Sequence, residues 1–197
     1  MKVIGITGGV GSGKSTLVSE LIKKYNATSL LADEAAGELR KKGGACYDSL
    51  IKLLGEEILD EEKNIDSKKM ASKIFTSKEL LEGVNDIIHP AVRIYILDRI
   101  KEEKEKGKYD YFFLEAALLI ECGYVEIVDE MWYIFADRVK REERLFNQRG
   151  YSKEKTDSIV KSQLSEEEFR AKADFVVDNS FTLENSLEQI EAHLRSI

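Results

Sequence analysis

A glycine-rich stretch near the start of the chain has the residue types and spacing of a phosphate-binding loop. Residues 8–15 read GGVGSGKS and fit the pattern G-x-x-x-x-G-K-[ST]. Glycines at these positions let backbone N–H groups turn inward around phosphate oxygens, and a helix that follows adds the positive end of its dipole. Lys14 is then expected to reach the β- and γ-phosphates, and the Ser15 hydroxyl to join the coordination shell of Mg²⁺. The alternative is an ordinary glycine-rich turn, but the pattern favours a nucleoside-triphosphate site.

A strand and a helix must flank such a loop, and the sequence predicts both. Residues 2–6, KVIGI, have the β-branched and apolar character of a buried strand. After the loop, Leu17, Leu21 and Ile22 recur at helical spacing. The order strand, glycine loop, helix is the structural setting that the motif requires.

Two carboxylates stand at or beyond the ends of predicted strands. Asp33 follows a second strand predicted at residues 28–31, and we expect it to lie beside the strand that leads into the loop. There it could take a proton from an attacking hydroxyl; the alternative is a helix N-cap. Glu115 ends a third strand predicted at residues 109–115. It has the position of a carboxylate that meets the water shell of a metal ion, or it is an ordinary acid at a strand end.

Residues 138–155 reverse the charge of the chain. They hold seven basic and three acidic side chains, a net +4, whereas the whole chain carries −7. The planar guanidinium of arginine suits phosphate oxygens, so this segment is predicted to be a helical lid that closes over a triphosphate. The alternative is a solvated helix with i,i+4 ion pairs such as Arg138–Glu142.

The histidines and cysteines give weaker signals. His89 precedes the single proline, Pro90, and is either a structural hydrogen-bonding residue or a ligand. His193 is expected on the surface of the last helix. Cys46 and Cys122 have no C-x-x-C spacing and no neighbouring metal ligands, so both are interpreted as reduced residues.

The order of the predicted elements indicates an α/β fold. Further segments are predicted as strands at residues 130–136 and 174–179, and as helical stretches at residues 33–107 and 137–172. Pro90 is expected at a first helical position, Gly107 at a helix end, and Thr182 at the N-cap of a closing helix. Such an alternation predicts a parallel sheet, and ligands bind beyond the carboxyl ends of its strands.

Composition excludes several classes of protein. The 197 residues are 43% hydrophobic, which suits one α/β domain with a modest insertion. A net charge of −7 argues against a nucleic-acid or membrane-surface binder. The longest aliphatic run, residues 116–120, is too short to span a bilayer, and Lys14 and the glycines interrupt the N-terminus before a signal-peptide core could form. We therefore expect a cytoplasmic monomer or small homo-oligomer.

Together these segments resemble the dephospho-CoA kinase family nearly from end to end. The opening IGITGGVGSGKST is shared with other P-loop kinases. More specific are IIHPAV in the first helical stretch, AALLIECG after the third strand, REERLFNQRGYSKEKTDSIVKSQ in the arginine-rich segment and ADFVVDNS at the closing strand. The resemblance implies a P-loop NTPase-type parallel sheet flanked by helices, with a helical substrate-binding insertion and a helical lid.

The resemblance also implies a reaction: transfer of the γ-phosphoryl group of ATP to the ribose 3′-hydroxyl of dephospho-CoA, with Mg²⁺, as the last step of CoA biosynthesis. It implies one kinase domain over residues 1–197, with a core at 1–33, 108–137 and 173–197, a CoA-binding insertion at about 34–107 and a lid at about 138–172. The implied site residues are, as catalytic groups, Lys14, Asp33 and Arg144; as ATP-binding groups, Gly9, Val10, Gly11, Ser12, Gly13, Lys14, Ser15, Thr16, Arg144 and Arg149; as substrate-binding groups, Asp33, His89, Arg93, Glu115, Leu118 and Glu121; and as metal ligand, Ser15.

Several positions depart from the family pattern. They are Leu31 for the first acid of a D-x-D motif, Gly37 for an arginine, Glu115 and Ala117 for an aspartate and a proline, Gln148-Arg149 for Arg-Asp, Phe169 for a lysine and Phe181 for a glycine. A one-residue shift makes Arg149 the second lid arginine. The departures leave open another P-loop nucleotide or metabolite kinase, or a nucleotide-binding protein with weakened transfer activity.

Overall fold

A computed structural model describes residues 1–196, and the chain divides into two compact units. One unit comprises Met1–Leu30 together with the chain from Glu103 onward. The other comprises Leu31–Glu102. The glycine loop and the arginine-rich segment therefore belong to the same unit.

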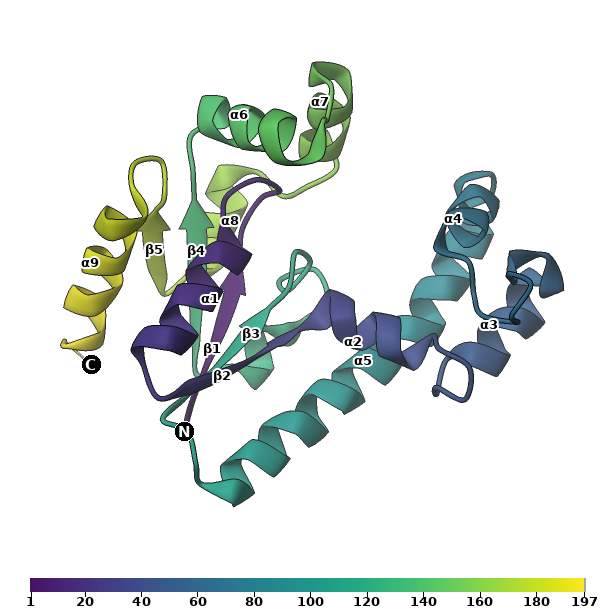
Figure 1. The fold of residues 1–197 in the computed structure, drawn as a ribbon, viewed down its shortest axis with the longest axis horizontal. Coiled ribbons are helices and arrows are strands. Elements are labelled where there is room, and N and C mark those ends of the chain that lie inside the picture. Colours follow the sequence, from purple (N-terminus) through teal and green to yellow (C-terminus); the bar gives the residue numbers. More distant parts are fainter. Residues whose placement is uncertain (197) are drawn as a thin grey trace. The chain divides into compact units, whose positions relative to one another are not determined.

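The first unit is built on a parallel sheet, and the described residues form five strands of it in the order β2-β3-β1-β4-β5 (Figure 1). The strands are β1 at Lys2–Thr7, β2 at Ala27–Leu31, β3 at Tyr111–Glu115, β4 at Glu130–Phe135 and β5 at Phe175–Asp178. Strand β1 pairs in parallel with β3 on one side and β4 on the other, so that Ile4 lies opposite both Phe113 and Glu130. The predicted fold class is confirmed.

The position of the second strand corrects one expectation. Strand β2 neighbours β3 and not β1, and it ends at Leu31. Strand β3 is buried at four of its five residues, as a strand inside a parallel sheet requires, whereas β2 is only partly buried along most of its length and suits an edge. The expectation that Asp33 ends a strand adjacent to the one leading into the loop is therefore wrong.

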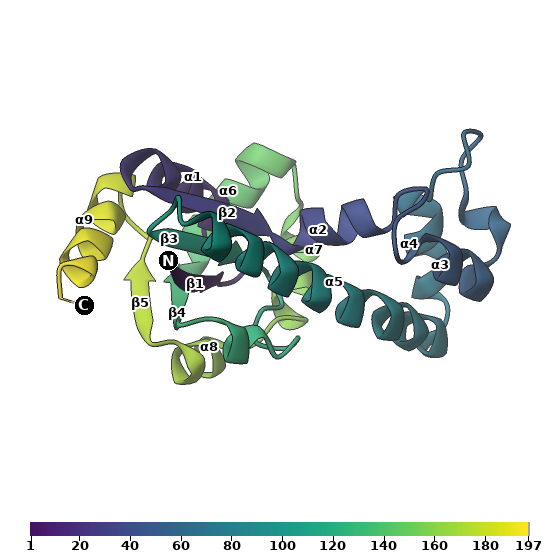
Figure 2. The same ribbon diagram turned by 90° about the horizontal axis from the view of Figure 1, so that it is seen from below.

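Helices cover both faces of this sheet and its carboxyl edge. They are α1 at Lys14–Lys24, the 3₁₀ turn η2 at Tyr124–Ile127, α6 at Arg138–Arg149, α7 at Lys153–Lys161, α8 at Glu166–Lys172 and α9 at Leu183–Leu194. Helices α6 and α7 lie beyond the arrowheads of β1 and β4 (Figure 1), and α1 and α8 lie on opposite sides of the sheet (Figure 2). Thr182 caps α9 as predicted, because its hydroxyl accepts from the backbone N–H of Asn185.

Strand side chains of the first unit bury one face against α1 and α9. The fully buried residues there include Ile4, Leu17, Phe113, Trp132 and Ile190. Burial of side chains this large supplies most of the stabilisation of a domain, and it fixes the strand ends from which the functional loops leave. The core thus positions the loop after β1 and the turn after β3 at one edge.

The second unit is helical, as predicted for residues 33–107. Its elements are α2 at Ala32–Leu39, α3 at Tyr47–Leu54, the 3₁₀ turn η1 at Glu56–Ile58, α4 at Ser67–Phe75 and the greater part of α5, which runs over Lys78–Lys106. Leu50, Leu54, Ile58, Met70 and Val84 form its core. Among the described residues, no helix is long and apolar enough to cross a membrane.

Pro90 is not at a first helical position, because α5 continues through it. A proline inside a helix removes one N–H donor and costs about 3 kcal/mol. Apolar residues on both sides of Pro90 hold the helix against the rest of the unit, because Val84 lies in its core and Ile88 and Ala91 pack against that core. Packing therefore overrides the local signal, while Gly107, with φ +60°, follows the last helical residue as predicted.

His193 is not a surface residue. Its ring stacks on Phe175 with centroids 3.9 Å apart, and its Nε2 contacts a carboxylate oxygen of the buried Glu130. Cys46 is buried and Cys122 half-buried, and neither forms a disulfide within residues 1–196. No group of three or more His, Cys, Asp or Glu residues in that range could hold a metal ion.

Candidate active site

The glycine loop leaves the carboxyl end of β1 and enters α1 with two residues in backbone conformations that side chains rarely adopt. Gly8 has φ +148°, and a Cβ there would lie 2.5 Å from the carbonyl oxygen of Ile134. Gly13, the residue before α1, has φ +91°. Glycine is needed at both positions, since the first has no room for a side chain and both have strained dihedrals. The loop is thus held tightly against the end of β4.

Lys14 and Ser15 begin the helix that follows the loop. Lys14 Nζ donates to the carbonyl oxygens of Gly8 at 2.7 Å and Gly9 at 3.2 Å, so the ammonium group lies over the loop. Ser15 Oγ donates to Oε1 of the buried Glu115 at 2.6 Å. The structure therefore brings together the hydroxyl and the carboxylate that the sequence assigned to the neighbourhood of a metal ion.

Ser12 occupies the middle of the loop and links it to β5 and α6. Asn179, which follows β5 and is buried, donates from Nδ2 to the carbonyl oxygen of Ser12 at 2.7 Å. Arg144 on α6 donates to the same carbonyl at 3.2 Å and to that of Asn179 at 2.8 Å. Ser12 Oγ is itself buried with no hydrogen-bond partner in the described chain, which is the state expected of a hydroxyl in a loop that receives phosphate oxygens.

Arg141 lies one turn before Arg144 and contacts the first half of the loop. Its Nε donates to the carbonyl oxygen of Val10 at 2.9 Å, and its Nη2 donates to Oε1 of Gln163 at 3.2 Å. The backbone N–H of Val10 donates to that same Gln163 oxygen at 3.0 Å. Burial lowers the pKa of the Arg141 guanidinium and raises the pKa of the neighbouring Tyr133 phenol.

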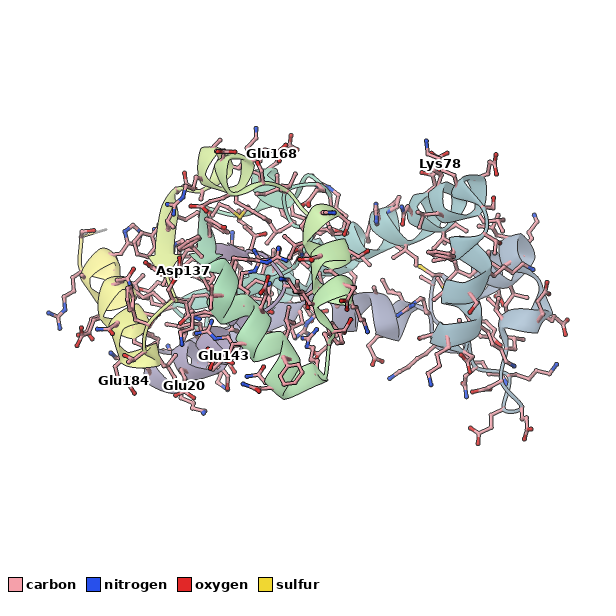
Figure 3. The ribbon with its side chains drawn as sticks, turned by 90° about the horizontal axis from the view of Figure 1, so that it is seen from above. Glu20, Lys78, Asp137, Glu143, Glu168 and Glu184 are labelled. Atoms are coloured by element: carbon pink, nitrogen blue, oxygen red, sulfur yellow. The ribbon has the colours of Figure 1, made fainter. Side chains whose placement is uncertain are left out.

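The arginine-rich segment holds both acid-paired residues and residues that contact the glycine loop, and its closure over a triphosphate stays a prediction. Figure 3 shows side-chain nitrogens gathered beside α6, the helix on which Glu143 is labelled. Arg138 pairs with Glu142 at 2.5 Å, and Lys140 pairs with Glu143 at 3.1 Å, as in a solvated helix. The neighbouring arginines of the same helix instead contact the glycine loop.

The other predicted residues of the first unit lie in exposed positions. Arg149 is the last residue of α6, and its side chain makes no hydrogen bond or ion pair to any described residue. Leu118 is 47% exposed in the turn after β3, and Glu121 is exposed in the same turn. Thr16 is exposed in the first turn of α1.

The second unit holds the remaining predicted residues. Asp33 is exposed in the first turn of α2, where Leu31 is the N-cap residue, so the capping alternative for Asp33 is wrong. His89 and Arg93 are half-buried and one turn apart on α5. The roles of these three residues toward a substrate stay predictions.

Sequence reasoning assigned no role to Arg141, Gln163 or Asn179. Asn179 follows a strand end at the edge where α/β ligands bind, and this position was a usable signal. Arg141 was visible only as one of several basic residues in residues 138–155. Gln163 had no local signal, because its partner Val10 is 153 positions away.

The chain is similar to known proteins over nearly its whole length. The dephospho-CoA kinase family model matches residues 2–185. A dephospho-CoA kinase of Carboxydothermus hydrogenoformans is 34% identical over 190 residues, covering 96% of this chain and 91% of that protein. A crystal structure from Thermus thermophilus superposes with a TM-score of 0.83 at 28% identity, covering 100% of this chain and 97% of that one. A dephospho-CoA kinase from Campylobacter jejuni has the same fold, with a TM-score of 0.73 at 23% identity over 100% and 99% of the two chains. The chain belongs to the dephospho-CoA kinase family.

Proposed function

We propose that the protein transfers the γ-phosphoryl group of ATP to the ribose 3′-hydroxyl of dephospho-CoA, giving CoA and ADP. The observation that carries the proposal is the glycine loop, in which Lys14 lies over the loop carbonyls and Ser15 joins the buried Glu115. The identity of the acceptor substrate is inferred from membership of the family. Phosphoryl transfer depends mostly on positioning and on neutralising charge, and both are available at this edge of the sheet.

In this proposal the loop residues Gly9 to Thr16 bind the phosphates of ATP through their backbone N–H groups. Lys14 neutralises charge that develops on the transferring group, and Arg144 and Arg149 bind the triphosphate from the lid. Ser15 and Glu115 offer the hard oxygen donors that Mg²⁺ prefers. Mg²⁺ held there would neutralise part of the charge on the phosphates of ATP.

The acceptor side of the reaction is assigned to the helical unit and to the turn after β3. Asp33 would take the proton of the 3′-hydroxyl as its oxygen bonds to the γ-phosphorus and the bond to the β–γ bridging oxygen breaks. His89 and Arg93, with Leu118 and Glu121, would bind dephospho-CoA. Exposure of Asp33 leaves its carboxylate accessible to a substrate hydroxyl.

ADP release, measured by a coupled assay with dephospho-CoA, with AMP or with no acceptor, tests the proposal. We expect release with dephospho-CoA to exceed the other two by at least about a hundredfold, since binding of the whole acceptor orients its hydroxyl. Release with AMP alone would indicate a nucleoside monophosphate kinase. Nucleotide binding without release in any arm would indicate a nucleotide-binding protein with lost transfer activity.

A further inference from the structure

The basic residues of α6 differ in what neutralises them. Arg138 pairs with Glu142 and Asp157, and Lys140 pairs with Glu143. Arg141, in contrast, contacts no carboxylate in residues 1–196, and its partners are a backbone carbonyl and an amide oxygen. A guanidinium that is bound only to neutral oxygens keeps its full charge available for an anion.

The surroundings of Arg141 make this unpaired charge costly. Its guanidinium lies against the backbone of Gly9, so closely that a Cβ at that position would overlap it. Beside it, the buried Tyr133 ring stacks on the buried Phe169 ring with centroids 4.8 Å apart. Taking a charge out of water without an ionic partner is unfavourable, so a bound anion would stabilise this arrangement.

The location of Arg141 along the loop identifies the part of the nucleotide that it would meet. Lys14 Nζ lies 3.2 Å from the carbonyl oxygen of Gly9, the residue that the Arg141 guanidinium covers. Lys14 is the residue assigned to the β- and γ-phosphates. Arg144 contacts Ser12 instead, nearer the start of α1. The two arginines therefore contact different parts of the loop. Arg141 lies at Gly9, which Lys14 also contacts.

We propose that Arg141 is a phosphate-binding residue for the γ-phosphoryl group and that Gln163 is the residue that positions it. This proposal rests on the proposed kinase function. On nucleotide binding, the guanidinium would donate to phosphate oxygens while it keeps its contacts to the neutral oxygens of Val10 and Gln163. Because one oxygen of Gln163 accepts from both Val10 N–H and Arg141, the glutamine fixes the guanidinium in register with the loop.

The test compares the affinity for a non-hydrolysable ATP analogue with the affinity for ADP, measured by calorimetry together with thermal melting. In Arg141→Gln we expect the analogue to bind about tenfold more weakly or worse, and ADP within about threefold of the unaltered protein, since the lost charge-assisted contact involves the third phosphate. Lys140→Gln is the matched control, because it removes the same charge from an exposed, acid-paired neighbour. A merely structural role of Arg141 would weaken both nucleotides equally, and that result would overturn the proposal.

Gln163→Glu provides a second variant that keeps the structural contacts. A glutamate oxygen can still accept from Val10 N–H and Arg141, so the melting temperature should not fall. The new carboxylate pairs with the guanidinium and repels phosphate, so the analogue should bind about tenfold more weakly. Analogue binding within threefold of the unaltered protein would overturn the proposal even if Arg141→Gln fails to fold. Absence of nucleotide binding in the unaltered protein would instead overturn the kinase function itself.

Discussion

The two ends of the parallel sheet differ in the partners of their positively charged side chains. At the carboxyl end, Lys14 contacts loop carbonyls, and Arg144 contacts only neutral oxygens. At the amino end, Lys2 Nζ lies 2.7 Å from Oε2 of Glu130, and Trp132 and His193 contact the other oxygen of that carboxylate. At the carboxyl end the Arg144 guanidinium is bound to neutral oxygens, whereas at the amino end the Lys2 ammonium is part of an ionic network.

This difference separates a binding site from a structural one. Burial raises the pKa of the Glu130 carboxyl, but hydrogen bonds from Lys2, His193 and Trp132 outweigh that effect and hold the pKa below its ordinary value. The Glu130 carboxylate at the amino end is therefore already balanced by partners within the protein. In a chain with net charge −7, the arginines at the carboxyl end instead form a local positive region suited to a polyphosphate.

Asp33 follows the carboxyl end of β2 by two residues, and its replacement should give the largest loss of activity. We expect Asp33→Asn to lower turnover by about two to four decades, because asparagine cannot take a proton from the 3′-hydroxyl. Nucleotide affinity and melting temperature should stay unchanged, since Asp33 is exposed. Turnover on dephospho-CoA, ATP affinity and thermal melting should be measured on one preparation. A loss of less than tenfold would count against a base role.

Lys14→Ala should abolish most transfer at the carboxyl end. We expect kcat/KM to fall about a hundredfold or more, because removal of one preorganised charge contact costs several kcal/mol in the transition state. Lys23→Ala, at an exposed and acid-paired position of the same helix, is the control and should keep normal activity. Steady-state kinetics with dephospho-CoA measure both. Activity of Lys14→Ala within a few-fold of the unaltered protein would mean that the loop is no working kinase site.

Glu115→Gln should affect the dependence on Mg²⁺ more than the fold. Glutamine can still accept the hydrogen bond from Ser15, but it lacks the charge that attracts a divalent cation. We expect about tenfold more Mg²⁺ to be needed for half-maximal activity, as for a lost outer contact of a metal site. A Mg²⁺ titration of ADP release checks this. An unchanged titration curve would remove Glu115 from the metal site.

Glu130→Gln should lower stability and leave catalysis nearly unchanged. Loss of the buried negative charge leaves the Lys2 ammonium without its ionic partner, which we expect to cost about 1–3 kcal/mol in the free energy of unfolding. Because the pKa of Glu130 is lowered in the folded protein, its ionised form stabilises above pH 4.5, its ordinary value, and the contribution is lost as pH falls through the folded-state value.

Urea unfolding of both proteins at several pH values checks this prediction. The difference in stability should be largest near neutral pH and shrink below pH 4.5. Glu20→Gln, which loses an exposed acid paired with Lys23, should show no comparable difference. A difference that does not depend on pH would contradict the assigned role of the carboxylate.

Local patterns predicted the parts of the site that are contiguous in sequence. The strand, the glycines and the helix around Lys14 form one uninterrupted segment, so their types alone determine the loop. Strand-end position was enough to place Glu115 near the loop, because carboxyl ends of parallel strands share an edge. The Thr182 cap likewise depends only on its neighbours.

The features that the sequence did not predict depend on distant contacts. The order of β2 and β3 is decided by which strand must be buried on both faces, not by order along the chain. Arg141 and Gln163 are ordinary polar residues until the fold brings both to Val10. Pro90 and His193 were misjudged because tertiary packing outweighed a local preference.

Thermal melting of Arg144→Gln and Glu130→Gln, each with and without a non-hydrolysable ATP analogue, tests the contrast between the two ends most directly. A ligand that binds only the folded state raises its melting temperature by an amount that grows with the logarithm of its affinity. We predict that Arg144→Gln keeps a nearly normal ligand-free melting temperature but loses most of the increase caused by the analogue. Glu130→Gln should melt earlier without ligand yet show the full increase. A full increase in Arg144→Gln, or a lost increase in a folded Glu130→Gln, would contradict the assignment of binding to the carboxyl end.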